Sequence, residues 1–236
     1  MLYIKVPYDE KDIAKKLGAV WIPSKKSWAV MHRRDYYKFG YWIFKEFNEP
    51  LILIDAVYLV EGIRHCPKCG NLTTVIAMGT RKIMFLNNKA YYTNPDSPYE
   101  EERKLIHPDA MDEYHWTEAK KYSNSDYVFI SPLPESFVVK YKDVLKESYN
   151  FKFGYSKTMM SSYYANHCQS CNTIQGDFYL FDEPSSPFWI YDYHHAEKLT
   201  FKKIKLKDDL VTEPNGVPYD YELSNYHKYQ DSNFTY

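Results

Sequence analysis

Glycine is scarce in this chain, and the glycine-rich motifs that bind phosphates are missing. Only 8 of the 236 residues are glycine, which is about 3% against a typical value of about 7%. None of them falls into GxGxxG or GxxxxGK[ST], the loops that cradle phosphates in dinucleotide-binding and P-loop proteins. The sequence also lacks GxSxG, HExxH, SxxK and the kinase motifs. The enzyme classes that depend on these motifs are therefore excluded.

Neither a surplus of one charge nor a long apolar run is present. Thirty Lys and Arg residues stand against 31 Asp and Glu residues, which excludes a polycation that coats nucleic acid but allows a local basic patch. Asp55 and Glu61 interrupt the longest apolar runs, which fall well short of the roughly 20 residues of a membrane helix. The opening MLYIKVPYDEKDIAKK is charged too early for a signal peptide. We therefore expect a soluble, cytoplasmic protein with no membrane partner.

All four cysteines fall into two CxxC pairs, Cys66/Cys69 and Cys168/Cys171. Disulfides are rare in cytoplasmic proteins, and two such pairs with no cysteine left over predict one tetrahedral four-thiolate zinc site of the closed, structural kind. The pairs are about 100 positions apart, whereas an ordinary zinc ribbon needs roughly 15–20. Either the ribbon carries a large insertion or the two pairs act independently. Redox chemistry and four reduced, buried thiols are the alternatives.

The two pairs share a local sequence frame. Each is preceded by a histidine, His65 or His167, and followed by a residue type that tolerates positive φ, Gly70 or Asn172. We expect a similar tight turn at each pair. The two histidines are candidates for hydrogen bonding to the site, for alternative ligation, or simply for solvation.

The N-terminal segment reads as a βαββ unit with a basic bias. Strands are expected at 2–6, 19–22 and 27–31, and a helix is expected to begin at Asp9 and to end at Gly18. Residues 1–49 hold ten basic and six acidic side chains. The candidate nucleic-acid contacts are Lys15, Lys16, Lys25, Lys26, Arg33 and Arg34, with Trp21, Trp28 and Tyr36 as candidate stacking faces. Alternatively, the tryptophans are core and the basic face is solvated or docks on acidic parts of the same chain.

This segment resembles the small DUF5710 domain. The matching residues are Val6, Pro7, Tyr8, Lys11, Ala14, Lys15, Leu17, Gly18, Ala19, Trp21, Lys26, Trp28 and Val30, whereas Ile22 departs from a usually polar position. The resemblance implies company with plasmid-type primases, helicases and other DNA-handling proteins, and no established catalysis. The region from Ser156 to Glu183 resembles a block of uncharacterised bacterial zinc-ribbon proteins, which supports an interrupted ribbon.

The rest of the chain is mixed. We expect hairpin strands at 72–78 and 82–86, further strands at 127–130, 176–181 and 199–206, and a helix from about 134 to 149. The apolar stripe of that helix, with Phe137, Val138, Tyr141, Val144, Leu145 and Ser148, is expected to be core. His107, Asp109, Asp112 and His115 are interpreted as a solvated acidic face, with a second metal site as the alternative.

These observations combine into one set of expectations. The fold class is α+β: a βαββ domain at 1–49, then a mixed or antiparallel β domain at 50–206 with an interrupted zinc ribbon and an insertion at 88–165. A polar, Tyr-rich segment at 207–236 follows, as an irregular tail or a loosely packed strap. The expected function is a zinc-binding, non-catalytic module for nucleic acid or a DNA-processing protein. The alternatives are an enzyme with its active site in the insertion, and an interaction protein of phage-defence or mobile-element systems.

Overall fold

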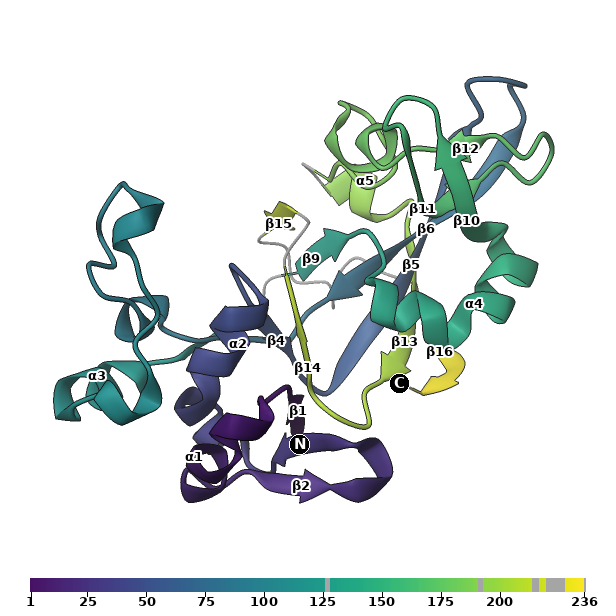
Figure 1. Cartoon of the computed structure of the whole chain (residues 1–236). Helices are drawn as coiled ribbons and strands as arrows, with labels where there is room; N and C mark the ends of the chain where they lie inside the picture. Colours follow the sequence, from purple (N-terminus) through teal and green to yellow (C-terminus); the bar gives the residue numbers. More distant parts are fainter. Residues whose placement is uncertain (126–127, 191–192, 214–216, 220–227, 236) are drawn as a thin grey trace. The chain divides into compact units, whose positions relative to one another are not determined.

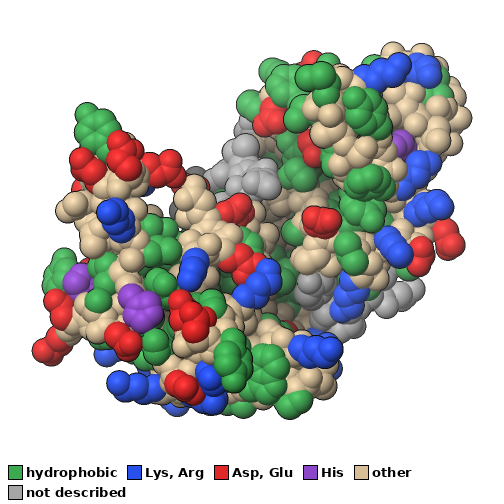
Figure 2. All heavy atoms as spheres, in the orientation of Figure 1, with side chains coloured by type: hydrophobic (Ala, Val, Ile, Leu, Met, Phe, Trp, Pro, Cys, Tyr) green, Lys and Arg blue, Asp and Glu red, His purple; other side chains and the backbone are tan. Residues whose placement is uncertain are grey.

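The computed structural model describes residues 1–125, 128–190, 193–213, 217–219 and 228–235 (Figure 1). It contains helices and mainly antiparallel sheets, which confirms the α+β class. Contacts divide the chain into unit 1, residues 1–55, 82–126 and 206–214, and unit 2, residues 56–81, 127–205 and 215–236. Unit 1 thus combines residues from all three predicted segments. Acidic and basic side chains are interspersed over the visible face (Figure 2), as expected for a net charge of −1.

Unit 1 contains two small sheets and three short α-helices. Its strands are β1 (Leu2–Ile4), β2 (Val20–Ile22), β3 (Ser27–Val30), β4 (Leu51–Leu53), β7 (Ile83–Phe85), β8 (Ser123–Ser125) and β14 (Leu210–Thr212), and its α-helices are α1 (Lys11–Lys16), α2 (Gly40–Glu46) and α3 (Glu113–Ala119). Short 3₁₀ turns lie between them, the longest at Arg33–Phe39. The strand orders are β1-β3-β2 and β14-β4-β7-β8.

The first sheet and α1 form the predicted βαββ unit. Helix α1 begins after a 3₁₀ turn at Tyr8–Glu10, so that Glu10 rather than Asp9 precedes it. Gly18 follows the helix at φ +104°, a conformation that favours glycine. Trp28 is 7% exposed and belongs to the core, whereas its cross-strand partner Trp21 is 45% exposed. Only one of the two candidate tryptophans is therefore available to a ligand.

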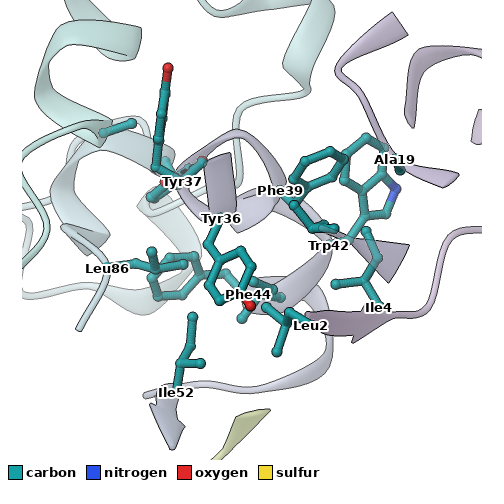
Figure 3. Close-up of a cluster of buried hydrophobic side chains, with 14 of the residues drawn as sticks. Leu2, Ile4, Ala19, Tyr36, Tyr37, Phe39, Trp42, Phe44, Ile52 and Leu86 are labelled. Carbon is teal, nitrogen blue, oxygen red and sulfur yellow. Dashed lines mark hydrogen bonds between the residues drawn. The ribbon is translucent and has the colours of Figure 1, made fainter. Parts of the chain in front are cut away.

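One apolar core joins the N-terminal strands to later parts of unit 1. Side chains of β1, the 33–39 turn, α2 and β4 meet in it, including Leu2, Tyr36, Phe44 and Ile52 (Figure 3). Tyr91, from the segment predicted as an insertion, is fully buried there, and its hydroxyl donates to the carbonyl of Tyr37 at 2.6 Å. The segment from 88 to 125 thus supplies core to the same unit as the N-terminus.

An ion-pair network in unit 1 holds the 33–39 turn to the segment around β14. Arg33 Nε and Nη2 donate to the two carboxylate oxygens of Asp209, each at 2.7 Å. The buried hydroxyl of Tyr36 donates to Asp209 Oδ2, also at 2.7 Å. Asp55 accepts from Arg33 at 2.9 Å and from Lys82 at 2.8 Å. The network therefore connects four stretches of sequence that lie far apart.

This network predicts a loss of stability in acid. The hydrogen bonds from Lys82 and Arg33 lower the pKa of the Asp55 carboxyl in the folded protein. The stabilisation is therefore fully present above the unfolded pKa, about 3.9, and is lost as the pH falls through the lower folded value. Urea unfolding followed from neutral to acid pH should show a steeper loss for the wild type than for Asp55→Asn. Asp9→Asn is the control, because Asp9 makes no ion pair within the described residues; equal pH dependence of all three proteins would contradict the prediction.

Unit 2 is built on a six-stranded mixed sheet. Its strands are β5 (Ala56–His65), β6 (Leu72–Thr80), β9 (Val128–Ser131), β10 (Phe151–Ser156), β11 (Ser161–His167), β12 (Ile174–Gln175), β13 (Thr200–Lys205), β15 (Val217–Tyr219) and β16 (Lys228–Thr235), and its α-helices are α4 (Glu135–Tyr149) and α5 (Tyr193–Ala196). The large sheet has the order β15-β9-β6-β5-β13-β16, and β10-β11-β12 form a second, three-stranded sheet. All pairs are antiparallel except β13 with β16.

Two predictions about the strands that follow the CxxC pairs were wrong. The strands expected at 72–78 and 82–86 do not pair with each other; β6 pairs with β5 along nine positions instead, because the short turn at the first cysteine pair closes that hairpin. Residues Phe178–Asp182 form a π-helical turn rather than a strand. There Phe178 and Tyr179 are exposed while Leu180 and Phe181 are buried, a pattern without the alternation of a strand.

The segment after residue 207, expected as an irregular tail or a loosely packed strap, contains the strands β14, β15 and β16. Each of these strands lies at the edge of a sheet, where β14 pairs with β4, β15 with β9 and β16 with β13.

Helix α4 has nearly the predicted bounds, but its predicted apolar stripe is only partly buried. Phe137, Val138 and Leu145 are buried as expected, but Val144 and Ser148 are exposed. Tyr141 has the non-helical angles φ −115° and ψ 15°, which place a kink within the helix. Tyr149 takes the buried position at the end of the helix instead.

Candidate metal centre

The two CxxC pairs adopt the same turn. In the first, the backbone N–H of Gly70 donates to the carbonyl of Cys66, and the N–H of Cys66 donates to Asn71, both at 2.9 Å. In the second, the N–H of Asn172 donates to Cys168 at 2.9 Å, and the N–H of Cys168 donates to Thr173 at 2.8 Å. The turns join β5 to β6 and β11 to β12. We call these two turns the knuckles.

The residue that follows each CxxC pair has the predicted left-handed conformation. Gly70 lies at φ +76° and Asn172 at φ +63°. Glycine adopts this region without steric cost and asparagine does so more readily than most residues. The shared sequence frame thus produces two equivalent turns.

The two knuckles bring all four sulfur atoms into one cluster. Cys66 Sγ lies 3.6 Å from Cys171 Sγ, and Cys69 Sγ lies 3.7 Å from Cys168 Sγ. All four sulfurs lie within 4.8 Å of one another. Four thiolates bound tetrahedrally at about 2.3 Å from a zinc ion are about 3.8 Å apart. The cluster therefore has the dimensions of a tetrahedral metal site, and the two pairs do not act independently.

The sulfur cluster shifts the pKa values of its thiols in opposite directions. Hydrogen bonds from the hydroxyl and backbone N–H of Thr173 lower the pKa of Cys171 to about 6, and the hydroxyl oxygen lies 3.3 Å from the sulfur. The backbone N–H of Asn71 stabilises the Cys69 thiolate, yet burial and the neighbouring sulfurs outweigh it and raise the pKa of Cys69 to about 12. Four thiolates repel one another at this distance, so a divalent cation is required before all four ionise.

Polar side chains hold the two knuckles against each other. In the second knuckle, the backbone N–H of Gln169 donates to Thr73 Oγ1, and the Gln169 side-chain oxygen accepts from the N–H of Thr74, both at 3.1 Å. The buried side chain of Asn166 pairs with the backbone of Ile76 like a short strand, accepting at 2.8 Å and donating at 3.0 Å. These contacts bridge about 90 residues of sequence.

Two further amides contact the site directly. Gln175, which is buried, directs Nε2 toward Cys66 Sγ at 3.6 Å. Asn150, at the left-handed end of α4, donates to the carbonyl of Cys168 at 2.9 Å. Sequence reasoning missed Asn166, Gln169, Gln175 and Asn150. For Asn166, Gln169 and Gln175 the only signal was their nearness to the second pair, and Asn150, 18 positions before Cys168, gave none. The partners that give these residues a role are supplied by the fold.

Neither histidine that precedes a knuckle joins the sulfur cluster. Nδ1 of His65 contacts the carbonyl of Gly70 and Nδ1 of His167 contacts the carbonyl of Ala165, each at 2.9 Å. Across the described residues, the four cysteines form the one group of three or more candidate ligands. The two histidines therefore contact backbone carbonyls, and the group of candidate metal ligands consists of the four cysteines.

Comparison with known families gives a match in the N-terminal segment. Residues 1–43 match a family model described as a domain of unknown function, DUF5710. This confirms the resemblance of the N-terminal segment. The comparisons with curated proteins and with solved structures yielded no match. No helix within the described residues is long and apolar enough to cross a membrane.

The basic side chains of the DUF5710 segment differ in their partners. Arg33 is engaged by Asp209 and Asp55, so it serves the fold. Lys15 pairs with Asp12, and Arg34 makes an exposed contact with Asp35 at 3.9 Å. Lys16, Lys25 and Lys26 are exposed and form no ion pair with any described residue. Of the candidate nucleic-acid contacts, Lys16, Lys25 and Lys26 are therefore the ones without an ion pair among the described residues.

The histidine and aspartate residues between 107 and 115, in the segment predicted as an insertion, form local contacts. Asp112 accepts from the backbone N–H of His115 at 3.0 Å as the N-cap of α3, and His115 Nδ1 lies 2.6 Å from the same carboxylate. The His107 ring packs against Tyr41, and Asp109 lies beside it on the 3₁₀ turn. These side chains organise a helix start and do not converge on a metal position among the described residues.

Proposed function

We propose that this protein binds one zinc ion through Cys66, Cys69, Cys168 and Cys171, and that the ion is structural. The observation that carries the proposal is the cluster of four sulfurs at tetrahedral spacing. Thiolates select soft metals, and an S₄ tetrahedron suits zinc. Four protein ligands leave no position for a reactive water, so the site stabilises the fold rather than performing catalysis.

The arrangement around the cysteines argues against redox chemistry. A reactive CxxC pair owes its low pKa to the N-terminus of a helix. Here a β-strand follows each knuckle, β6 after the first and β12 after the second. The closest sulfur contacts also run between the knuckles rather than within them. Both observations favour a shared metal over a dithiol.

We further propose that the DUF5710 segment, residues 1–43, binds nucleic acid. Trp21 is 45% exposed, and the turn that follows β2 carries Lys25 and Lys26. Tyr8 is also exposed, with Lys11 Nζ 3.8 Å from its ring centre. Hydrophobic side chains gather over β2 with basic side chains nearby (Figure 2). Lysines beside exposed aromatic faces suit phosphate contacts and base stacking.

A charge-reversal variant tests this proposal. In Lys16→Glu/Lys25→Glu/Lys26→Glu, binding of a single-stranded oligonucleotide should be abolished, and Trp21→Ala should cost about 1–3 kcal/mol of binding free energy. Wild-type affinity should fall as salt rises, with a slope of about −0.7 for each phosphate contacted. Fluorescence anisotropy at several salt concentrations measures both effects.

The matched control is Lys142→Glu/Lys146→Glu/Lys205→Glu, which makes the same change in net charge on exposed residues of unit 2. Arg33 is left out because its reversal would disrupt the network with Asp209. Equal loss of binding in both triple variants, or affinity that ignores salt, would contradict a nucleic-acid surface and favour a protein partner.

A further inference from the structure

A cavity of about 480 Å³ lies in unit 2, beside the first knuckle. Its wall includes the end of β5, at Arg64 and His65, the loop from Glu183 to Pro187, and α5 with the turn that follows it. This volume is within the range of sites that bind small molecules, about 300–1,000 Å³. None of the lining residues belongs to the sulfur cluster or to the DUF5710 segment.

Packing and hydrogen bonds hold the cavity wall in place. A Cβ atom at Gly62 would lie 3.0 Å from Pro187 Cβ, so the glycine lets the 183–187 loop pack closely on β5. Arg64 donates to the carbonyl of Tyr179 at 2.9 Å. The buried hydroxyl of Ser186 donates to the carbonyl of Leu180 at 2.9 Å. The cavity is therefore formed before any ligand arrives, which lowers the cost of binding.

The polar groups in the wall are mostly donors and cations. Arg64, His65, His195 and Lys198 line the cavity, against one carboxylate, Glu183. Neither Arg64 nor Lys198 forms an ion pair with a described residue. A guanidinium and an ammonium group that line one cavity and form no ion pair with a described residue suit a ligand with two or more anionic oxygens. A phosphate monoester is the common group with that chemistry.

The remaining wall is apolar and partly aromatic. The ring of Tyr179, 47% exposed, and the prolines 184 and 187 line the same cavity. Such surfaces stack with flat rings. We propose that this cavity binds a phosphate monoester that carries a flat ring, of about the size of a mononucleotide. The phosphate would contact Arg64 and Lys198, and the ring would lie against Tyr179.

Titration calorimetry with the full-length protein tests the proposal. AMP should bind, inorganic phosphate should bind more weakly, and adenosine should show no measurable binding. Lys198→Ala should weaken AMP about tenfold, the typical effect of losing one charge-assisted hydrogen bond. Glu183→Gln should tighten it severalfold, because the opposing charge is removed. The control is Lys205→Ala, an exposed lysine of β13 outside the cavity.

The source of the phosphate and the independence of the site are tested in parallel. A 5′-phosphorylated oligonucleotide that binds better than its 5′-hydroxyl counterpart would identify the end of a nucleic acid as a ligand. Binding of AMP would identify a free nucleotide as a ligand. The triple variant of Lys16, Lys25 and Lys26 should bind AMP like the wild type, so failure of the proposed DNA surface is distinguishable. Absence of AMP binding at millimolar concentration, adenosine binding as tightly as AMP, or equal effects of the Lys198 and Lys205 variants would overturn the proposal.

Discussion

Replacing Cys168 by serine is expected to release the metal and to unfold the part of unit 2 that contains the knuckles. Binding of a structural zinc ion contributes an apparent free energy of about 10–16 kcal/mol in small zinc domains, and that energy is folding energy. The proposed ion would also close a loop of about 100 residues, for which a covalent cross-link would contribute about 5 kcal/mol. The purified wild type should contain one zinc ion per chain by elemental analysis.

The matched control for this prediction is Ser170→Ala, in the same knuckle. Ser170 is exposed and is not one of the candidate ligands, so this variant should keep the ion and the wild-type unfolding curve. A chelator should reproduce the Cys168→Ser phenotype, seen as loss of the cooperative thermal transition and of amide protection in β5, β6 and β11. No metal in protein purified under reducing conditions, iron in place of zinc, or two ions per chain would each contradict the shared zinc site.

Replacing Arg33 by alanine is expected to destabilise unit 1 far more than replacing its neighbour Arg34. The Asp209 side chain is only 5% exposed, and the variant would leave its carboxylate without the bidentate cation. Breaking a buried pair in this way costs about 3–5 kcal/mol, and we expect about 3 kcal/mol because the Arg33 side chain is 42% exposed to water. Arg34 is 81% exposed, so its loss should change the free energy of unfolding by less than about 0.5 kcal/mol.

Chemical denaturation of both variants measures the difference. Adding Asp209→Asn to Arg33→Ala should recover part of the lost stability, because the uncompensated charge is removed while Tyr36 keeps a hydrogen-bond partner. Similar unfolding free energies for the two arginine variants would show that the network does not stabilise unit 1.

The Arg33 network also explains why the sequence alone could not separate candidate nucleic-acid contacts from residues that stabilise the fold. Composition marks Arg33 and Arg34 as equivalent members of one basic run. The fold separates them, since one faces Asp209 and the other faces solvent. Arg33 pairs with acidic residues of its own chain, whereas Lys25 and Lys26 form no ion pair with a described residue. A partner 176 positions away cannot be read from the local pattern.

The local features of this protein were determined by the sequence alone. The βαββ unit, the positive φ at Gly70 and Asn172, the bounds of α4 and the turn at each CxxC pair all follow from residue types within a few positions of each other. Periodicity, turn preference and CxxC spacing act over that range, so they were predictable.

Only the tertiary structure decided how these pieces combine. It paired β6 with β5 instead of β7, drew Tyr91 into the N-terminal core and brought Asn166 to the backbone of Ile76 so that the two knuckles meet. It also recruited strands β14 to β16 from a polar tail. The physical reason is common to all of these: backbone hydrogen bonds at a sheet edge and buried polar contacts depend on partners far away in the chain, and they leave little trace in the composition of either partner.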